Sequence, residues 1–252
     1  MLTEDPLPTW ASGRRVLSVG GQTNRPVDDV GLVTDAGGWV TIQAKKGMRV
    51  EPRPDGALGE ALRQLVEIDE VGVPDGASDA LRPLDPDRDL VLILSDDSAP
   101  RTVNANLAPV VSRLRVLPAT IPLTDAVPNE NVKQGEALDI LKDHLSRCWR
   151  ERWAREITDT ELRRLTSVLS VRALYIAEDG EDYATVRIIL RDLAGDAATA
   201  PDLWKALTTE GQRLAEERMH LDRGGLVKIL DEQGIVLRPL ARLRNDIVNR
   251  PG

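Results

Sequence analysis

Near its N-terminus the chain holds a carboxylate, a side-chain amide and an ammonium group that could act together: Asp29, Gln43 and Lys45. Gln43 and Lys45 stand at alternate positions of a β-rich run, and strand side chains alternate between faces, so both point to the same side. Ile42 and Ala44 then point into the opposite layer. The pattern predicts a polar set that converges at the edge of a small sheet. The plainer alternative is an ordinary solvated sheet face.

Such a set suits metal-dependent hydrolysis of a phosphodiester bond. Mg²⁺ prefers oxygen ligands, which the Asp29 carboxylate, the Gln43 amide and the backbone carbonyl of Ala44 can supply. The ion activates a water and neutralises charge that builds up on the phosphate, and we expect Mn²⁺ to be able to replace it. Lys45 would orient that water or stabilise the charged transition state. We therefore expect Asp29, Gln43 and Lys45 to be catalytic, and Asp29, Gln43 and Ala44 to be the metal ligands.

A β-hairpin is expected to bring these residues together. Two β-rich runs, Val27–Thr34 and Trp39–Lys45, are joined by Asp35-Ala36-Gly37-Gly38, which is a strong hairpin signal. The first run carries the acidic residue beside the second. Asp29 is preferred to Asp28 as the ligand because the apolar run follows it directly, which leaves Asp28 in a supporting role.

Basic residues follow the motif. Lys46 and Arg49, together with Lys45 and Arg53, form a cluster that suits a track for DNA phosphates, although a solvated edge is an equal alternative. The whole chain is acidic, with 33 Lys and Arg against 41 Asp and Glu and a net charge of -8. This balance argues against a general nucleic-acid coat protein, but it leaves room for a local basic patch on a nuclease.

Strand and helix patterns alternate over the rest of the first half. A continuous apolar run suits a strand buried on both faces, and two segments have apolar residues at helical spacing. Gly72–Arg88 is rich in Pro, Gly and Asp and is expected to be an exposed loop. Gly20-Gly21 ends the first strand and lacks the spacing of a phosphate-binding loop. The expected elements are a strand at Arg15–Val19, a helix around Leu58–Val66 entered through Pro54-Asp55-Gly56, a strand at Leu90–Leu94 and a helix at Val103–Leu114.

The second half is expected to be a separate, mostly helical domain. Pro118, Pro122 and Pro128 mark the boundary, which divides the chain into residues 1–128 and 129–252. Thr158-Asp159-Thr160-Glu161 has the pattern of a capping box at a helix start. Ser170–Ala177 fits either a helix end or a short strand. Amphipathic helices are expected at Glu136–Trp153, Asp182–Leu193, Ala200–Glu217 and Arg223–Gln233.

The composition is that of a globular protein that can bury a core, with 41% hydrophobic and 29% charged residues. A single cysteine, Cys148, excludes an intramolecular disulfide framework and fits the reducing cytoplasm. No stretch is apolar enough to span a membrane, so no membrane partner is expected. His144 and Cys148 could place two metal ligands on one helix face, but helix packing is the favoured interpretation.

An acidic residue, a glycine-rich hairpin and a Gln-x-Lys motif follow one another here. This order resembles the PD-(D/E)xK nuclease superfamily in its glutamine-bearing, Mrr-like branch. More closely, Pro26-Val27-Asp28-Asp29-Val30-Gly31 with Gln43-Ala44-Lys45-Lys46-Gly47 is similar to nuclease domains at the N-terminus of bacterial anti-phage proteins. Those include double-stranded DNA endonuclease effectors of cyclic-oligonucleotide defence and effectors fused to STAND-type or NACHT-type NTPases. The resemblance covers roughly residues 14–117.

This resemblance implies an α/β fold of the restriction-endonuclease type, with a mixed sheet flanked by helices, and a magnesium-dependent endonuclease acting on double-stranded DNA. It also implies that Gln64, on the helix after the motif, supports the active site. A homo-oligomer is expected, and an NTPase sensor domain in a longer parent chain is the implied partner. The alternative is a nuclease-like module that binds DNA or partner subunits without cleaving.

The chain departs from the family at its start. The family core opens with a helix that carries a glutamate of the metal site, and Pro6 and Pro8 disfavour a helix here. Either Glu4 takes that role, or the sequence begins after that helix, or the metal site is incomplete.

Overall fold

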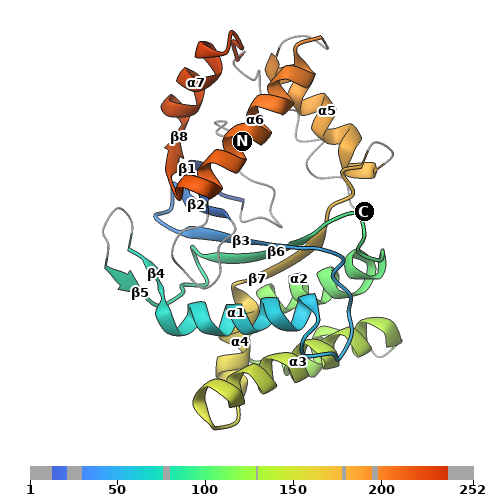
Figure 1. The fold of residues 1–252 in the computed structure, drawn as a ribbon. Coiled ribbons are helices and arrows are strands. Elements are labelled where there is room, and N and C mark those ends of the chain that lie inside the picture. The colour runs from blue at the N-terminus through green and yellow to red at the C-terminus, as the bar shows by residue number, and fades with distance from the viewer. Residues whose placement is uncertain are drawn as a thin grey trace.

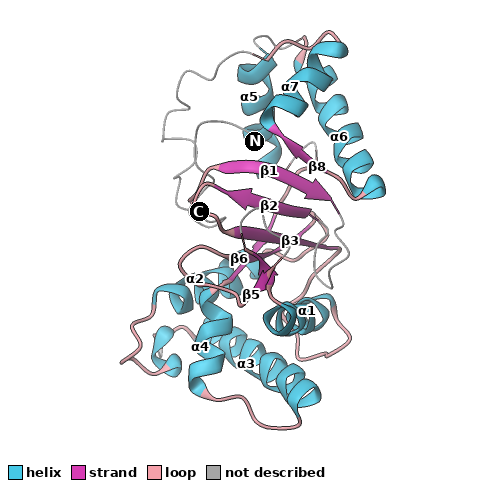
Figure 2. Cartoon of the chain, turned by 90° about the vertical axis from the view of Figure 1, so that its left-hand side faces the viewer, coloured by secondary structure: helices cyan, strands magenta, loops and turns pink. Residues whose placement is uncertain are grey.

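A six-stranded mixed β-sheet lies at the centre of the molecule, with helices on both of its sides (Figures 1 and 2). The computed structural model describes residues 13–21, 30–75, 80–128, 130–177, 180–194 and 198–237. The strand order is β7-β6-β3-β2-β1-β8. The strands of this sheet are β1 (Val16–Gly21), β2 (Val30–Thr34), β3 (Trp39–Lys45), β6 (Leu90–Ser95), β7 (Leu169–Ala173) and β8 (His220–Asp222).

Two kinds of strand pairing meet at β3. β1, β2 and β3 form an antiparallel meander, whereas β3, β6 and β7 run parallel, and β8 adds antiparallel to the outer edge of β1. The carboxyl ends of β3, β6 and β7 therefore lie at one edge of the sheet. The mixed α/β class expected from the sequence is confirmed.

The predicted hairpin between β2 and β3 is present. Val33 pairs with Trp39, and the turn is closed by a hydrogen bond from the Thr34 N–H to the Gly38 carbonyl of 2.9 Å. Gly37 has a φ of 69°, which a residue with a side chain rarely adopts. The glycine in this turn thus fixes the register that places Gln43 and Lys45 on their strand.

One face of the sheet carries the main hydrophobic core. Strand residues such as Val91 and Ile93 pack there against helices that lie below the sheet in Figure 1. A fully buried leucine such as Leu62 or Leu141 contributes about 1.5–3 kcal/mol through burial. The helices on this side are α1 (Ala57–Val71), α2 (Ala108–Val116), α3 (Val132–Trp153) and α4 (Asp159–Ser167), with a π-helical turn at Val103–Leu107 before α2 and a 3-10 turn at Leu123–Ala126 after it.

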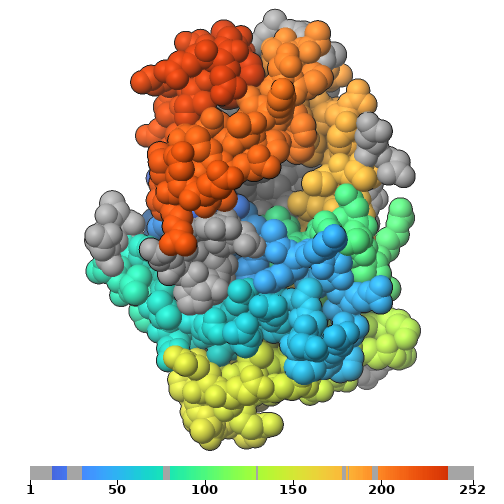
Figure 3. All heavy atoms as spheres, viewed as in Figure 1, coloured from blue at the N-terminus to red at the C-terminus, as the bar shows by residue number. Residues whose placement is uncertain are grey.

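The C-terminal helices lie on the other side of the sheet and have a small core of their own. They lie above the sheet in Figure 1 and form the orange and red part of the surface in Figure 3. α6 packs on β1 at Gly21, where an added Cβ would lie 2.5 Å from the backbone nitrogen of Ala215. The expected strand end at Gly20-Gly21 is therefore wrong: both glycines are strand residues, and Gly21 allows the helix to approach. These helices are α5 (Glu181–Ala194), α6 (Ala200–Glu217) and α7 (Arg223–Glu232).

The expected division at residues 128/129 does not coincide with the packing. β7 and β8 both come from the second half, and they form the two edges of the shared sheet. α3 and α4 bury their apolar faces in the same core as α1 and α2. The segment Ser170–Ala177, which the sequence left undecided, contributes most of β7. The second half therefore completes the α/β unit as well as adding helices to it.

The described part of the stretch Gly72–Arg88 is not only loop. It contains a short antiparallel pair, β4 (Val73–Pro74) and β5 (Leu81–Arg82). The predicted capping box is confirmed, since the Thr158 hydroxyl accepts from the Glu161 N–H while the Glu161 carboxylate accepts from the Thr158 N–H. Among the described residues, no helix is both long and apolar enough to cross a membrane.

Candidate functional site

Gln43 and Lys45 lie on the same face of β3, as the alternation predicts. Both contact α1, whereas Val40 and Ile42 belong to the apolar cluster on the opposite face. The exposed side chain of Ala44 also lies on that opposite face, because it alternates with its neighbours. The motif thus stands at the carboxyl end of β3, beside the helix that follows it.

The Gln43 side chain is buried, with 1% of its surface exposed. Its Nε2 donates a long hydrogen bond of 3.4 Å to the Ala61 carbonyl of α1. Its Oε1 has no hydrogen-bond partner among the described residues. The opposite amide orientation would set two oxygens against each other, so Oε1 is the atom left without a donor. A buried unbonded polar atom costs about 1–3 kcal/mol, so this oxygen is a place where a water or an ion can bind.

Lys45 is half-buried, and its Nζ donates a hydrogen bond of 2.9 Å to Oε1 of Gln64. Gln64 lies on α1, so the helix after the motif fixes the end of the lysine side chain. The sequence resemblance placed Gln64 in this supporting position, and the structure brings the two residues together.

The acidic member of the predicted set cannot be placed, since Asp28 and Asp29 lie outside the described residues. The first described residue of β2 is Val30, which pairs with Ile42, the neighbour of Gln43. The chain therefore enters β2 next to the motif. The proposed ligand role of Asp29 and the supporting role of Asp28 stay predictions.

Lys46 and Arg49 are exposed on the segment that leaves β3, and no ion pair joins either of them to another described residue. Arg53, further along the same segment, is engaged by Asp55: its Nε lies 2.9 Å from Oδ1 of that carboxylate. Of the basic cluster seen in the sequence, Lys46 and Arg49 therefore keep charge available for an anion, and Arg53 is largely neutralised.

Ser95 and Asp96, at the end of β6, also lie at this place, and the sequence analysis did not single them out. Lys45 pairs with Ser95 in the parallel register of β3 and β6. The Ser95 hydroxyl donates to the Lys45 carbonyl at 2.9 Å, and Asp96 Oδ1 accepts from the Gly47 N–H at 2.8 Å. The sequence signal that could have indicated these residues is a pair of polar residues at the end of a buried apolar run. Nothing local indicated that this strand pairs with β3.

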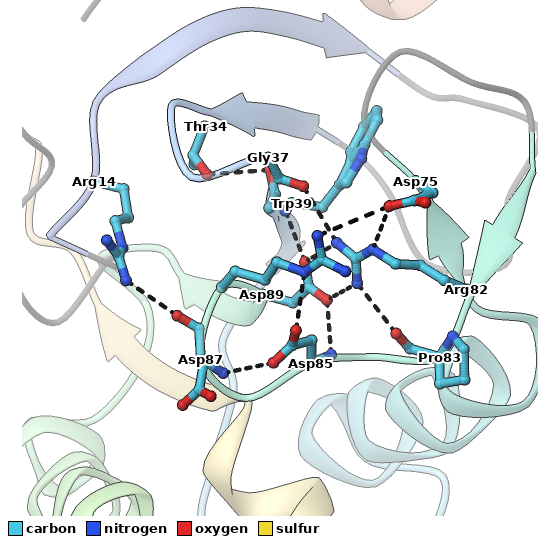
Figure 4. Close-up of polar contacts among 12 residues, drawn as sticks. Arg14, Thr34, Gly37, Trp39, Asp75, Arg82, Pro83, Asp85, Asp87 and Asp89 are labelled. Carbon is cyan, nitrogen blue, oxygen red and sulfur yellow. Dashed lines mark hydrogen bonds and ion pairs between the residues drawn. The ribbon is translucent and has the colours of Figure 1, made fainter.

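A network of buried charges occupies the opposite end of the strands (Figure 4). The Asp89 carboxylate, whose side chain is fully buried, accepts from the Trp39 N–H at 2.9 Å and from the Asp85 N–H at 2.8 Å, and pairs with the Arg82 guanidinium. The hydrogen bond with Asp89 raises the pKa of Arg82. Both oxygens of the Asp89 carboxylate are bonded, and this network fastens β5 to the start of β3 and β6.

His144 and Cys148 pack within the molecule. The His144 Nε2 lies 2.8 Å from the Glu51 carbonyl, which ties α3 to the segment after β3. Cys148 is buried, and burial raises the pKa of its thiol to about 11. The described parts of the chain contain no group of three His, Cys, Asp or Glu side chains that could hold a metal ion.

Comparison with protein-family models finds none that matches the chain, and comparison with curated proteins finds no match either.

Proposed function

We propose that this chain is a metal-dependent endonuclease of the PD-(D/E)xK type, with a restriction-endonuclease-like fold, that hydrolyses phosphodiester bonds of double-stranded DNA. The observation that carries this proposal is the pair of side chains at the end of β3. The buried Gln43 Oε1 lacks a donor among the described residues, and the Lys45 ammonium on the same face is held by Gln64. A merely solvated sheet face would not bury an amide and leave its oxygen unbonded.

The donor chemistry fits a hard divalent cation. Gln43 Oε1 is a neutral oxygen without a competing donor, and Mg²⁺ and Mn²⁺ take oxygen ligands. In this proposal Gln43 Oε1, the Asp29 carboxylate and the backbone carbonyl of Ala44 hold the ion, with Asp28 in support. When bound, the ion supplies Lewis-acid polarisation of the phosphate and an activated water.

The side chains around that position have separate roles in the proposal. Lys45 places its ammonium beside the phosphate, where it orients the attacking water and compensates the negative charge of the transition state. Gln64 orients Lys45 through the 2.9 Å hydrogen bond. Lys46 and Arg49 contact the DNA backbone, which positions the duplex without reading its sequence.

The biological setting is proposed from the resemblance of the motif. In this proposal the protein is a cytoplasmic effector of bacterial anti-phage defence, and an NTPase sensor domain of a longer parent chain controls the nuclease. A homo-oligomer would place two active sites side by side, so that both strands of a duplex could be cut. We therefore expect low activity for a dispersed monomer and higher activity when the chain is assembled.

The deciding experiment is plasmid cleavage with purified protein, in Mg²⁺ or in excess EDTA. Lys45→Ala should lose cleavage while keeping its fold, because a polar substitution of this kind costs little stability. Lys205→Ala is the matched control, since Lys205 is an exposed lysine on α6. It should cut as the wild type does.

Cleavage by Lys45→Ala at the wild-type rate, or cleavage that persists in EDTA, would show that the assignment is wrong. Duplex binding without any cleavage by the wild-type protein would favour the non-cutting nuclease-like module instead. Circular dichroism of each variant separates a lost activity from a lost fold.

A further inference from the structure

The segment that leaves β3 directly follows the proposed catalytic lysine and turns sharply. Gly47 adopts a φ of 59°, in the left-handed region that favours glycine. Lys45 is the last residue of β3, so strand pairing fixes the backbone before it but not the backbone after it. The lysine side chain has four rotatable bonds, so it does not fix its own ammonium group. A shift of the Lys45 backbone therefore moves Nζ by a similar distance or more.

Ser95 joins both sides of this turn. Its hydroxyl donates to the Lys45 carbonyl at 2.9 Å and accepts from the Met48 N–H at 3.0 Å. Ser95 and Met48 are both buried, so water does not compete for these hydrogen bonds. One hydroxyl thereby fixes the distance between the residue that ends the strand and the residue that follows the turn.

Asp96 holds the middle of the same turn. Its Oδ1 accepts from the Gly47 N–H at 2.8 Å, and also from the Ser98 hydroxyl at 2.6 Å and the Ser98 N–H at 3.2 Å. The Ser98 hydroxyl and the Gly47 N–H lower the pKa of this carboxyl, and the charge of Lys46 adds to the effect. Asp96 therefore stays ionised, and Ser98 fixes its orientation.

We propose that Ser95 and Asp96 are positioning residues for Lys45: they fix the backbone from Lys45 to Met48, so that Nζ is held beside Gln43. The inference rests on the proposed nuclease function of Lys45. Gln64 fixes the ammonium end of the side chain, and the Ser95–Asp96 pair fixes the backbone end. Asp96 acts through the Gly47 N–H and touches neither substrate nor metal.

Cleavage kinetics of the full chain test the proposal. Ser95→Ala and Asp96→Ala should lower kcat about 10- to 100-fold with KM nearly unchanged, because misplacement of a catalytic group by an ångström has an effect of this size. Asp96→Asn keeps the Oδ1 acceptor for Gly47 and should retain most of the activity. Thr34→Val is the control: it removes a buried hydroxyl that donates to the Gly38 carbonyl in the turn before β3, and should leave kcat unchanged.

Amide hydrogen exchange gives a readout that does not depend on activity. Ser95→Ala should raise the exchange rate of the Met48 amide, and Asp96→Ala that of the Gly47 amide, while amides in the core of β3 keep their protection. Unchanged exchange at both amides would overturn the proposal whatever the kinetics show.

The outcomes separate this inference from the proposed function. If Lys45→Ala is inactive while Ser95→Ala and Asp96→Ala cut at the wild-type rate, the positioning role is wrong and the nuclease function stands. If Asp96→Asn is as impaired as Asp96→Ala, the charge of Asp96 takes part directly and the positioning role is wrong for that residue. If Lys45→Ala is fully active, both proposals fail together.

Discussion

Replacing Gln43 with methionine should make the protein more stable and inactive at once. Methionine has a similar length and no polar group, and it adapts to irregular core space. The substitution removes the one atom of the candidate site that is buried without a hydrogen bond among the described residues. A glutamine that served only the packing of the core would not become both more stable and inactive on replacement with methionine.

The expected gain follows from the hydrogen bonds of the amide. The unbonded Oε1 costs about 1–3 kcal/mol, which the methionine removes. The lost hydrogen bond from Nε2 to the Ala61 carbonyl is 3.4 Å long. At that length it contributes no more than about 0.5 kcal/mol. The difference leaves Gln43→Met more stable than the wild type by about 1 kcal/mol or somewhat more.

Urea denaturation in EDTA measures this difference without interference from bound metal. With a slope of about 2–3 kcal/mol per molar urea, the midpoint should rise by about 0.3–0.5 M. Cleavage in Mg²⁺ should be lost in the same preparation. A conserved fold, checked by circular dichroism, completes the measurement.

Gln134 offers a matched control, because it is also a buried glutamine but both ends of its amide are bonded. Its Oε1 accepts from Arg113 at 2.5 Å and its Nε2 donates to the Ala105 carbonyl at 3.3 Å. Gln134→Met should therefore destabilise the fold. If Gln43→Met is destabilised as much as Gln134→Met, or still cleaves DNA, the reasoning from the unbonded oxygen is refuted.

Other predictions concern DNA, metal and pH. Lys46→Ala and Arg49→Ala should each weaken duplex binding and reduce the slope of log K against log salt by about one, whereas Arg53→Ala, whose guanidinium is already paired, should change the slope little. Asp29→Ala should weaken Mg²⁺ binding in calorimetry, and Ca²⁺ should bind to the wild type without supporting turnover. The hydrogen bond from the neighbouring guanidinium lowers the pKa of Glu161 to about 2. The ionised Glu161 carboxylate should stabilise the fold fully above its ordinary pKa, and this contribution should be lost as pH falls through about 2. The difference in stability between wild type and Glu161→Gln should therefore vanish below that pH.

The features that could be predicted from the sequence are those set by residues close together along the chain. The alternation in Trp39–Lys45 gave the correct faces for Gln43 and Lys45, because a strand side chain has only two directions. The capping box at Thr158 was predictable for a similar reason, since donor and acceptor are three residues apart on one helix turn. The resemblance of the motif gave Gln64 a supporting role, and the structure adds its hydrogen bond to Lys45.

Features that depend on distant pairing were not visible in the sequence. β7 and β8 are short, and each pairs with a strand far away along the chain. Nothing in Ser170–Ala177 alone decides between strand and helix, because the decision comes from the edge of β6. Gly21 was interpreted as a strand end, but its small size serves the approach of α6. Ser95 was missed since its importance lies in facing Lys45 across a parallel pair.

The two ends of the central strands show how hydrogen bonding separates structural from functional polar groups. At the amino ends, the buried Asp89 carboxylate is bonded to Trp39, Asp85 and Arg82, so its charge is compensated and its geometry fixed. Such a network ties elements together, and both oxygens of its central carboxylate are already bonded. At the carboxyl ends, the Gln43 oxygen is buried without a donor among the described residues, and the nearby ammonium of Lys45 is held by a neutral amide in place of a counter-ion. Stability alone would favour a hydrogen-bond donor for the Gln43 oxygen or an apolar residue in its place. The pair of Gln43 and Lys45 stands where parallel strands present their carboxyl ends, a common place for ligand sites, and this position supports the proposal that it binds a cation and a phosphate.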